Sequence, residues 1–429
     1  MYNYLGVLKK STAIDHCISC NFFEPKSLDL ILSKNNRLEF YSLSEEEGLI
    51  PKKYINIYGK IKILLKIPTK KNKDNLFVLS QDLNFCLFSF DSLSNNINIL
   101  LSGSIKEDLG KIQNDILYTL DKNKNFLLIC AYKNIFKIIC VNTEMNQFNK
   151  YKNYTLRFQY EKIMFIAPFY LDNENKINNG DDNNILNFIV IKEMYDEKNS
   201  FQKEYIEMEK EIIMETFQIR IEPDSFNTFL NYKETNAVSN GKMINLKVNS
   251  KLRKIINNNN NNLDNNTIDS NKNSNINKKE ENKTIIYNCE KLVESINFME
   301  KINLEDEQNI DLMITHPNGL IILFFSSYAI YYQYNKENKS LLCKKSISYG
   351  KKRFIDYILV DEKNFSYYII DDLGFLYYFG FMKLKKENNF EEENLEMILQ
   401  YIGKVSPPSC IAYLNNNILF IGSIKSNIL

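Results

Sequence analysis

The chain has 429 residues, of which 44% are hydrophobic and 13% aromatic, and this is enough apolar material to bury a substantial core. The 54 Lys and Arg residues against 53 Asp and Glu residues give a formal net charge of +1, which excludes a strongly polycationic nucleic-acid binder. The two histidines, His16 and His316, lie far apart in the sequence, so a mechanism that needs a local pair of imidazoles is also excluded.

The numbers and positions of glycine and cysteine exclude further classes of protein. Only 13 glycines are present, and no Walker loop, dinucleotide fingerprint or nucleophile elbow can be written with them. The eight cysteines are irregularly spaced and lie mostly in apolar runs, which predicts reduced core residues of an intracellular protein rather than a disulfide framework. The first ten residues carry no basic region before a long apolar stretch, so no secretory signal is expected.

Short runs rich in Ile, Leu, Phe, Tyr and Val recur along the first third of the chain, separated by Asn-, Asp- and Lys-rich turns at intervals of roughly 8 to 12 residues. The runs are Asp29 to Ser33, Arg37 to Leu43, Ile61 to Ile67, Asn75 to Ser80, Phe85 to Phe90, Phe126 to Tyr132 and Ile135 to Val141. Many short strands joined by hairpin turns, without intervening helices, predict an all-β fold with a closed radial architecture.

Two segments in the middle of the chain break this pattern. Lys203 to Phe217 fits either a helix with one apolar face or a strand that pairs back onto Ile185 to Ile191, and the β context favours the strand. From Ser250 to Lys283 the chain is Asn-rich and nearly free of aromatic residues. Such a segment buries too little apolar surface to offset the entropy of ordering, so we expect a disordered insert within one domain.

The strand pattern resumes after the insert. Gly319 to Tyr334 is uncharged but too short to span a membrane, and Ser326-Ser327 divides it into two strand-length halves, so we expect a buried hairpin and no membrane contact. Further hairpins are predicted for Ser366 to Met382 and for Cys410 to Gly422, each with Asp, Asn or Gly residues at the turn.

Candidate chemistry is sparse. His16, Cys17 and Cys20 could supply three zinc ligands, but a structural zinc site needs four and the sequence holds no second C-x-x-C, so we expect buried strand cysteines and no metal. Lys351-Lys352-Arg353 is one of the best basic patches, yet it is short and not interleaved with aromatic residues, which favours a solvated face. No nucleophile, base and orienting group can be assembled, so we expect no catalytic residues, no cofactor and no enzyme.

One set of residues near the N-terminus is specific to a family. These residues fall in a single order at nearly ungapped spacing: Tyr2-Asn3-Tyr4, Thr12-Ala13, Leu30-Ile31, Lys34-Asn35, Arg37-Leu38-Glu39, Tyr41, Glu47-Gly48-Leu49, Pro51 and Tyr58 to Ile61. Together they resemble the family of the large subunit of the UV-damaged DNA-binding protein, the third subunit of splicing factor 3b and the largest cleavage and polyadenylation specificity subunit. The Lys-Asn-x-Arg-Leu-Glu run is similar to the first of these three. Gly403 and Ser409 to Ser423 resemble the family's Tyr-Leu-Asp-Asn-Gly-x-x-Phe-x-Gly-Ser strand pair.

The resemblance implies that residues 1–429 form a single seven-bladed β-propeller, the first of three in the family, interrupted by the insert at 250–283. The later propellers, including the one that docks the cullin, have no counterpart in these residues, so a cullin contact is not expected within this chain. The chain stops soon after Ile418 to Gly422, where the family continues into further strands, and we therefore expect a last blade that is incomplete at the C-terminus, with an unpaired, aggregation-prone edge.

The resemblance also implies a binding site. In the family, the polar turn of the last strand pair and its flanking tyrosine face the cleft that receives substrate receptors, and the matching positions here are Ser409, Tyr413, Asn415 and Asn416. Asn415 stands where the family has Asp, and Asn417 where it has Gly. The alternative is that Tyr413 is a blade-packing aromatic residue and the Asn run only a hairpin turn.

These features predict a non-enzymatic, nuclear interaction module that binds the substrate receptors of a DNA-damage-linked cullin-RING ubiquitin ligase, with nucleic acid contacted only indirectly. The cytoplasm is the alternative location. The alternative function, which the two RNA-processing relatives imply, is a structural scaffold in a splicing or 3′-end-processing complex.

Overall fold

The computed structural model describes residues 12–44, 46–107, 110–133, 135–143, 153–157, 162–170, 185–195, 210–221, 238–239, 242–243, 287–297, 310–335, 338, 340–383, 395–414 and 418–423. Every regular element in these ranges is a β-strand. No helix in this part of the chain has the length and apolar character that crossing a membrane requires.

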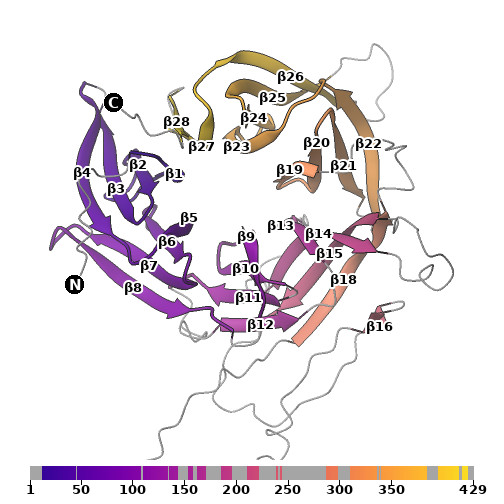
Figure 1. Ribbon diagram of the computed structural model, residues 1–429, viewed down its shortest axis with the longest axis horizontal. Helices are drawn as coiled ribbons and strands as arrows, with labels where there is room; N and C mark the ends of the chain where they lie inside the picture. The colour runs from indigo at the N-terminus through magenta and orange to yellow at the C-terminus, as the bar shows by residue number, and fades with distance from the viewer. Residues whose placement is uncertain are drawn as a thin grey trace, which may run out of the picture.

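Six antiparallel four-stranded sheets stand side by side in a ring around a central opening (Figure 1). Their strands are, for blade one, β1 (His16–Cys20), β2 (Asp29–Lys34), β3 (Arg37–Ser44) and β4 (Gly48–Asn56); for blade two, β5 (Ile61–Pro68), β6 (Asp74–Ser80), β7 (Asn84–Asp91) and β8 (Asn96–Ser104); and for blade three, β9 (Ile112–Leu120), β10 (Phe126–Tyr132), β11 (Ile135–Cys140) and β12 (Asn153–Arg157).

The second half of the ring continues in the same way. Blade four has β13 (Lys162–Pro168), β14 (Ile185–Tyr195), β15 (Lys210–Arg220) and β18 (Tyr287–Asn297); blade five has β19 (Ile310–His316), β20 (Leu320–Phe325), β21 (Tyr328–Asn335) and β22 (Ser340–Ser348); blade six has β23 (Phe354–Asp361), β24 (Ser366–Asp371), β25 (Phe375–Lys383) and β26 (Leu395–Lys404). A two-stranded sheet pairs β27 (Pro408–Tyr413) with β28 (Leu419–Ser423), and a short ribbon pairs β16 (Val238–Ser239) with β17 (Lys242–Met243).

The all-β propeller is confirmed, but the expected count of seven blades is wrong. The described residues form six four-stranded blades, and the remaining place in the ring, between blades six and one, holds only β27 and β28. A further four-stranded blade would need two more strands, which the described ranges do not supply. The insert expected at 250–283 lies outside the described residues.

The core consists of apolar layers between neighbouring blades. Central strands such as β10 and β20 are buried along their whole length, which explains why their sequences read as continuous apolar runs. The layers between successive blades one to six are large, whereas the two layers that pack β27 and β28 against blades one and six are small. The ring is therefore least extensively packed where its ends meet.

The ambiguous segment at 203–217 is a strand over its described part. β15 begins at Lys210 and pairs antiparallel with β14 along its entire length, as the strand alternative predicted, while 203–209 lies outside the described residues. Ile212 and Met214 pack in the layer between blades four and five. Phe217 packs in the layer between blades three and four. Burial on both faces explains why the segment lacks a strict apolar–polar alternation.

The β24–β25 turn contains a glycine that no other residue can replace without strain. Gly374 has φ +88°, and a Cβ atom there would lie 2.3 Å from the carbonyl oxygen of Val405. We expect Gly374→Ala to lower the free energy of unfolding by about 2 kcal/mol or more, because left-handed strain and a backbone clash add together. Urea denaturation followed by circular dichroism measures this loss.

Gly350→Ala is the matched control for this substitution. Gly350 has φ +71°, but nothing lies within 4 Å of a Cβ atom at that position, so only the conformational strain of about 1 kcal/mol applies. Equal losses in the two variants would show that the close approach to Val405 contributes nothing.

Candidate partner-binding site

The strand pair β27–β28 closes the ring and carries the predicted binding residues. On the side of blade one, the Ile14 amide donates a hydrogen bond to the Ser423 carbonyl oxygen at 3.0 Å, and the Ser409 hydroxyl donates to the Ile14 carbonyl oxygen. On the side of blade six, the Ile411 amide donates to Oδ2 of Asp356 on β23 at 3.0 Å. Two short strands are therefore fixed to both neighbours by hydrogen bonds in addition to their apolar contacts.

The structure places Ser409 and Tyr413 apart. Ser409 contacts the chain just before blade one, whereas the half-buried ring of Tyr413 lies 6.4 Å from the ring of Tyr368 on β24 of blade six. Four residues of strand separate the two positions, which corresponds to about 13 Å. They therefore form two ends of one strand and not a single cluster.

The turn that follows β27 is described only in part. The Leu414 amide donates to the Ile418 carbonyl oxygen at 2.8 Å, which closes the turn, while the predicted site residues Asn415 and Asn416 lie outside the described residues. Of the predicted site, the structure thus locates one residue that joins the ring ends and one tyrosine that keeps part of its ring open to solvent.

A carboxyl group that sequence reasoning missed lies beside the strand pair. Asp356 accepts hydrogen bonds from the amides of Tyr357 and Ile411, yet burial dominates and raises its pKa to about 7. Burial, with a smaller contribution from the charge of Asp356, also raises the pKa of Tyr118 on β9 to about 12, although 37% of the Tyr118 surface is open. The signal in the sequence was an aspartate placed among the apolar residues inside strand β23, whose other acidic residue, Asp361, only ends the strand.

The C-x-x-C cysteines do not act together. The Cys17 side chain lies beside that of Cys410 on β27, whereas Cys20 is buried in the layer between blades one and two. Residues three apart in a strand point to opposite faces, which explains the separation. Within the described ranges, no group of three or more His, Cys, Asp or Glu side chains is arranged to hold a metal ion.

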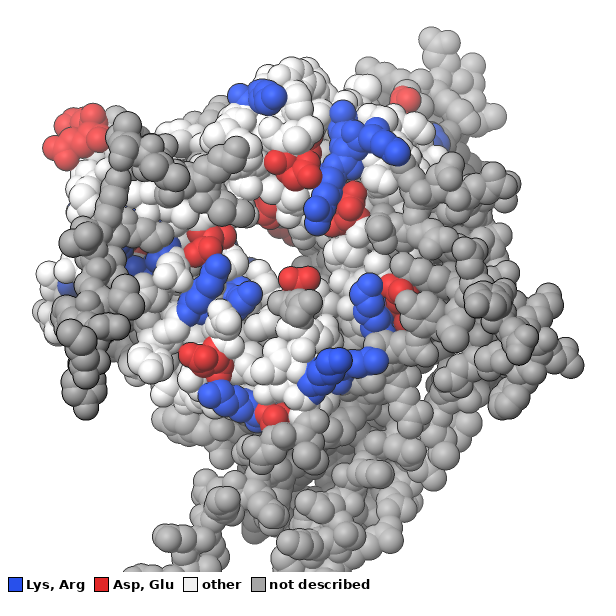
Figure 2. Space-filling view, in the orientation of Figure 1, with Lys and Arg blue, Asp and Glu red and all other residues white. Residues whose placement is uncertain are grey.

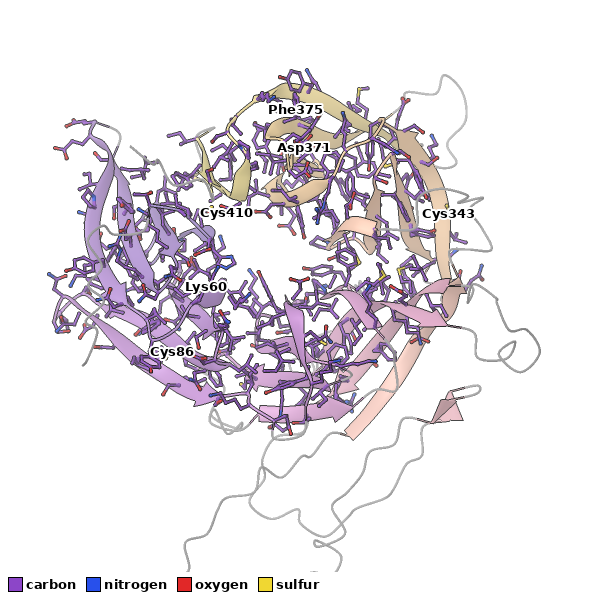
Figure 3. The ribbon with its side chains drawn as sticks, in the orientation of Figure 1. Lys60, Cys86, Cys343, Asp371, Phe375 and Cys410 are labelled. Carbon is purple, nitrogen blue, oxygen red and sulfur yellow. The ribbon has the colours of Figure 1, made fainter. Side chains whose placement is uncertain are left out.

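Figure 3 shows how the labelled thiols are distributed: Cys410 lies toward the inside of the ring, and Cys343 on β22 lies at its outer side. The space-filling view confirms that the ring is open at its centre, with basic and acidic side chains around the opening (Figure 2).

The comparisons with known proteins agree with this architecture. The sequence model of the family described as the RSE1/DDB1/CPSF1 first beta-propeller matches residues 13–427. The chain therefore belongs to this propeller family.

Three relatives with curated names are DNA damage-binding proteins. The chain is 28% identical over 150 residues to DNA damage-binding protein 1 of Drosophila melanogaster, and this match covers 34% of the chain and 13% of the fly protein. It is 29% identical over 140 residues to DNA damage-binding protein 1a of Arabidopsis thaliana and 28% identical over 141 residues to DNA damage-binding protein 1 of Solanum lycopersicum, each match covering 32% of the chain and 13% of the plant protein. The matched region is thus a small part of each relative.

Proposed function

We propose that this chain is a non-enzymatic protein-interaction propeller that binds the substrate receptors of a DNA-damage-linked cullin-RING ubiquitin ligase. The observation that supports this function most directly is the similarity to proteins named DNA damage-binding protein 1, in a fly and in plants. The proposed location is the nucleus, where such an adaptor would act on damaged DNA through its receptors and without touching nucleic acid itself. No cofactor enters this function, and the cullin contact is assigned to another part of the assembly.

The proposed receptor site is the end of the ring formed by the β27–β28 turn, with Tyr413, Asn415 and Asn416 as contacts. Ser409, at the far end of β27, would support the site by fixing the strand to the chain before blade one. A partly open tyrosine ring offers a large apolar area and one hydroxyl at low entropic cost, and amide side chains in a turn offer both donors and acceptors. An incoming helix of a receptor would pack on Tyr413 and bond to the turn.

A second function is a structural scaffold in a splicing or 3′-end-processing complex. It is supported by the family description, which names RSE1 and CPSF1 beside DDB1. Affinity purification of the tagged full-length protein, followed by mass spectrometry, separates the two. Cullin and substrate receptors among the co-purified proteins support the adaptor function, and splicing or 3′-end factors without them overturn it in favour of the scaffold.

The receptor site itself is tested by the double variant Tyr413→Ala/Asn416→Ala. We expect the protein to stay folded while its affinity for a co-purified receptor falls about 30-fold or more, corresponding to a loss of roughly 2 kcal/mol on the scale of an interface hot spot. Isothermal titration calorimetry measures the affinity, and circular dichroism melting measures the fold.

The matched control is Tyr58→Ala/Asn36→Ala, which removes the same side-chain types from exposed positions at the other end of the ring. The control should bind like the wild type. If the Tyr413 variant unfolds without a selective binding defect, Tyr413 is a blade-packing residue, and the assignment of the site fails.

A further inference from the structure

Three segments of the chain meet at one end of blade six, around the β24–β25 turn. They are 349–353, which leads into β23, the turn 371–375 itself, and 401–405, which ends β26. Three backbone hydrogen bonds hold these segments. The Lys352 amide donates to the Ser326 carbonyl oxygen at 2.7 Å, the Asp372 amide to the Arg353 carbonyl oxygen at 3.0 Å, and the Val405 amide to the Gly374 carbonyl oxygen at 2.8 Å. Figure 3 labels Asp371 and Phe375 in this blade. The segments therefore form a fixed surface rather than three independent loops.

Cations and aromatic rings alternate on this surface. The Lys352 ammonium lies 5.2 Å from the centre of the Tyr377 ring, and the Lys404 ammonium lies 4.7 Å from the centre of the Phe375 ring. The Tyr401 ring contacts both of these rings, at centroid distances of 5.9 Å from Tyr377 and 6.0 Å from Phe375. Such cation–π contacts hold the ammonium groups in place above the sheet.

We call this region the basic–aromatic surface and define it by Lys351, Lys352, Arg353, Phe375, Tyr401 and Lys404. Its four cations form no ion pair with any residue in the described ranges. The nearest acids in the same segments are Asp371, which is buried and accepts the amide protons of Leu373 and Phe375, and the exposed Asp372. The surface thus carries an excess of positive charge that no described side chain neutralises.

The same surface exposes apolar area. Tyr401 keeps 54% of its surface open to solvent, while Leu373 in the β24–β25 turn and Ile402 on β26 keep 61% and 48%. An exposed tyrosine ring on the same surface as an arginine is a combination found at interaction sites, because aromatic and arginine side chains are enriched there. Figure 2 shows a run of basic side chains over blades five and six, beside the central opening.

We propose that the basic–aromatic surface binds a short acidic peptide segment of a partner protein, with its carboxylates paired to the four cations and one apolar side chain packed on Tyr401. Charge complementarity favours an anionic partner. Of the two rings that define the surface, Phe375 is half-buried and already faces the Lys404 ammonium, so Tyr401 remains as the one anchor. Single-stranded nucleic acids, in contrast, are bound along a series of rings on which successive bases stack. The acidic peptide is therefore the occupant that matches this surface.

This surface is separate from the receptor site proposed above. Strands alternate in direction within each blade, so the β23–β24 and β27–β28 turns lie at one end of the ring and the β24–β25 turn at the other. The proposal therefore adds a second interaction surface and does not rest on the function assigned to Tyr413.

Fluorescence anisotropy with the full chain tests the proposal. The first probe is a fluorescein-labelled 12-residue peptide with three repeats of Glu-Asp-Glu-Phe. The second replaces every Glu by Gln and every Asp by Asn, and the third is a labelled oligothymidylate of 15 nucleotides. We expect the acidic peptide to bind and the neutral peptide to bind at least tenfold more weakly.

Charge reversal locates the site. We expect Arg353→Glu/Lys404→Glu to weaken binding of the acidic peptide at least tenfold, and Tyr401→Ala to weaken it about fivefold while leaving a peptide with Ala in place of Phe unaffected. The control variant Lys71→Glu/Lys122→Glu changes the net charge equally at exposed positions in turns at the opposite end of the ring, and should bind like the wild type. Circular dichroism melting shows whether each variant remains folded.

Three outcomes overturn the proposal. The first is a failure of the acidic peptide to bind the wild type, and the second is an equal loss in the control variant, which would mean that only net charge matters. The third is tighter binding of oligothymidylate that disappears in Arg353→Glu/Lys404→Glu, which would assign the surface to nucleic acid. Tyr401→Ala keeps the test valid if the charge-reversal variant fails to fold.

Discussion

Asp29→Ala is expected to lower the free energy of unfolding by at least about 3 kcal/mol, the largest loss that any single substitution discussed for this protein should produce. Asp29 begins β2 and is fully buried. Its Oδ2 atom accepts hydrogen bonds from the amides of Phe22 and Phe23 at 2.9 Å each and from the Ser27 hydroxyl, and its Oδ1 atom accepts one from the Ser42 hydroxyl at 2.7 Å. Alanine would leave four donors without their partner, at about 1 to 3 kcal/mol for each that stays buried.

The effect should spread beyond the carboxylate. Phe22 and Phe23 are held in the layer between blades one and two, where their rings contact Phe40 and Phe90. Losing the anchor of their amides would therefore loosen the packing between two blades as well as the β1–β2 connection. Equilibrium urea denaturation followed by tyrosine fluorescence measures the loss.

Asp29→Asn is the matched control, since it keeps the shape and one acceptor oxygen. We expect the free energy of unfolding of Asp29→Asn to lie between that of the wild type and that of Asp29→Ala. A stability within about 1 kcal/mol of the wild type for Asp29→Ala would mean that water or a rearranged loop satisfies the four donors, and the anchoring role would be wrong.

The strands and their turns were predictable from the sequence because their causes are local. Asn35 and Gly374 adopt φ values of +58° and +88° in turns that the sequence marked with Asn and Gly, since these residues tolerate the left-handed region. The hairpin from Gly319 to Tyr334 was predictable for a similar reason, because two apolar strand-length runs flank a pair of serines. Local chemistry is enough to fix such elements.

The number of four-stranded blades was not predictable in the same way. Blades pack through apolar layers to which many side-chain combinations contribute, so no repeated motif marks each blade in the sequence. The family resemblance supplied the number seven, and it was wrong for the strand pair β27–β28, which lacks two of the four strands among the described residues.

The charged and aromatic contacts escaped prediction because they join distant parts of the chain. Lys352 and Tyr377 are 25 positions apart, and Phe375 and Lys404 are brought together only by the register of β25 and β26. The basic run at 351–353 therefore looked like a solvated face with no aromatic neighbour. A register prediction for the last hairpins would have been needed to reveal the surface.

The stability of the junction between blade six and the strand pair β27–β28 should depend on pH. Asp356 of blade six accepts the amide proton of Ile411 on β27, and burial raises the pKa of its carboxyl group from 3.8 to about 7. The folded protein thus keeps this proton between about pH 4 and pH 7, where the unfolded chain has already released it. Because the folded state binds more protons in that window, its stability should fall as the pH rises from about 4 to about 7.

The expected contribution is a slope of about 1.4 kcal/mol per pH unit from this single group, adding up to a few kcal/mol across the window. Urea denaturation at half-unit steps of pH, in the wild type and in Asp356→Asn, measures it. Asparagine cannot ionise, so the variant should lack this loss. As the pH rises from about 4 to about 7, the wild type should therefore lose stability relative to Asp356→Asn. The change with pH is the quantity to compare, because the amide also alters the hydrogen bond to Tyr357 at every pH.

Asp361→Asn is the control, since Asp361 ends the same strand but is only partly buried, and the Asn364 side chain holds its pKa below the ordinary value. Replacing it should leave the slope between pH 4 and pH 7 unchanged. Hydrogen exchange at the Ile411 amide gives a second readout, because ionised Asp356 would draw water into the junction and expose β27. If the free energy of unfolding depends on pH in the same way in the wild type and in Asp356→Asn, the carboxyl group does not titrate in this window. Its protonation would then not stabilise the junction between blades six and one.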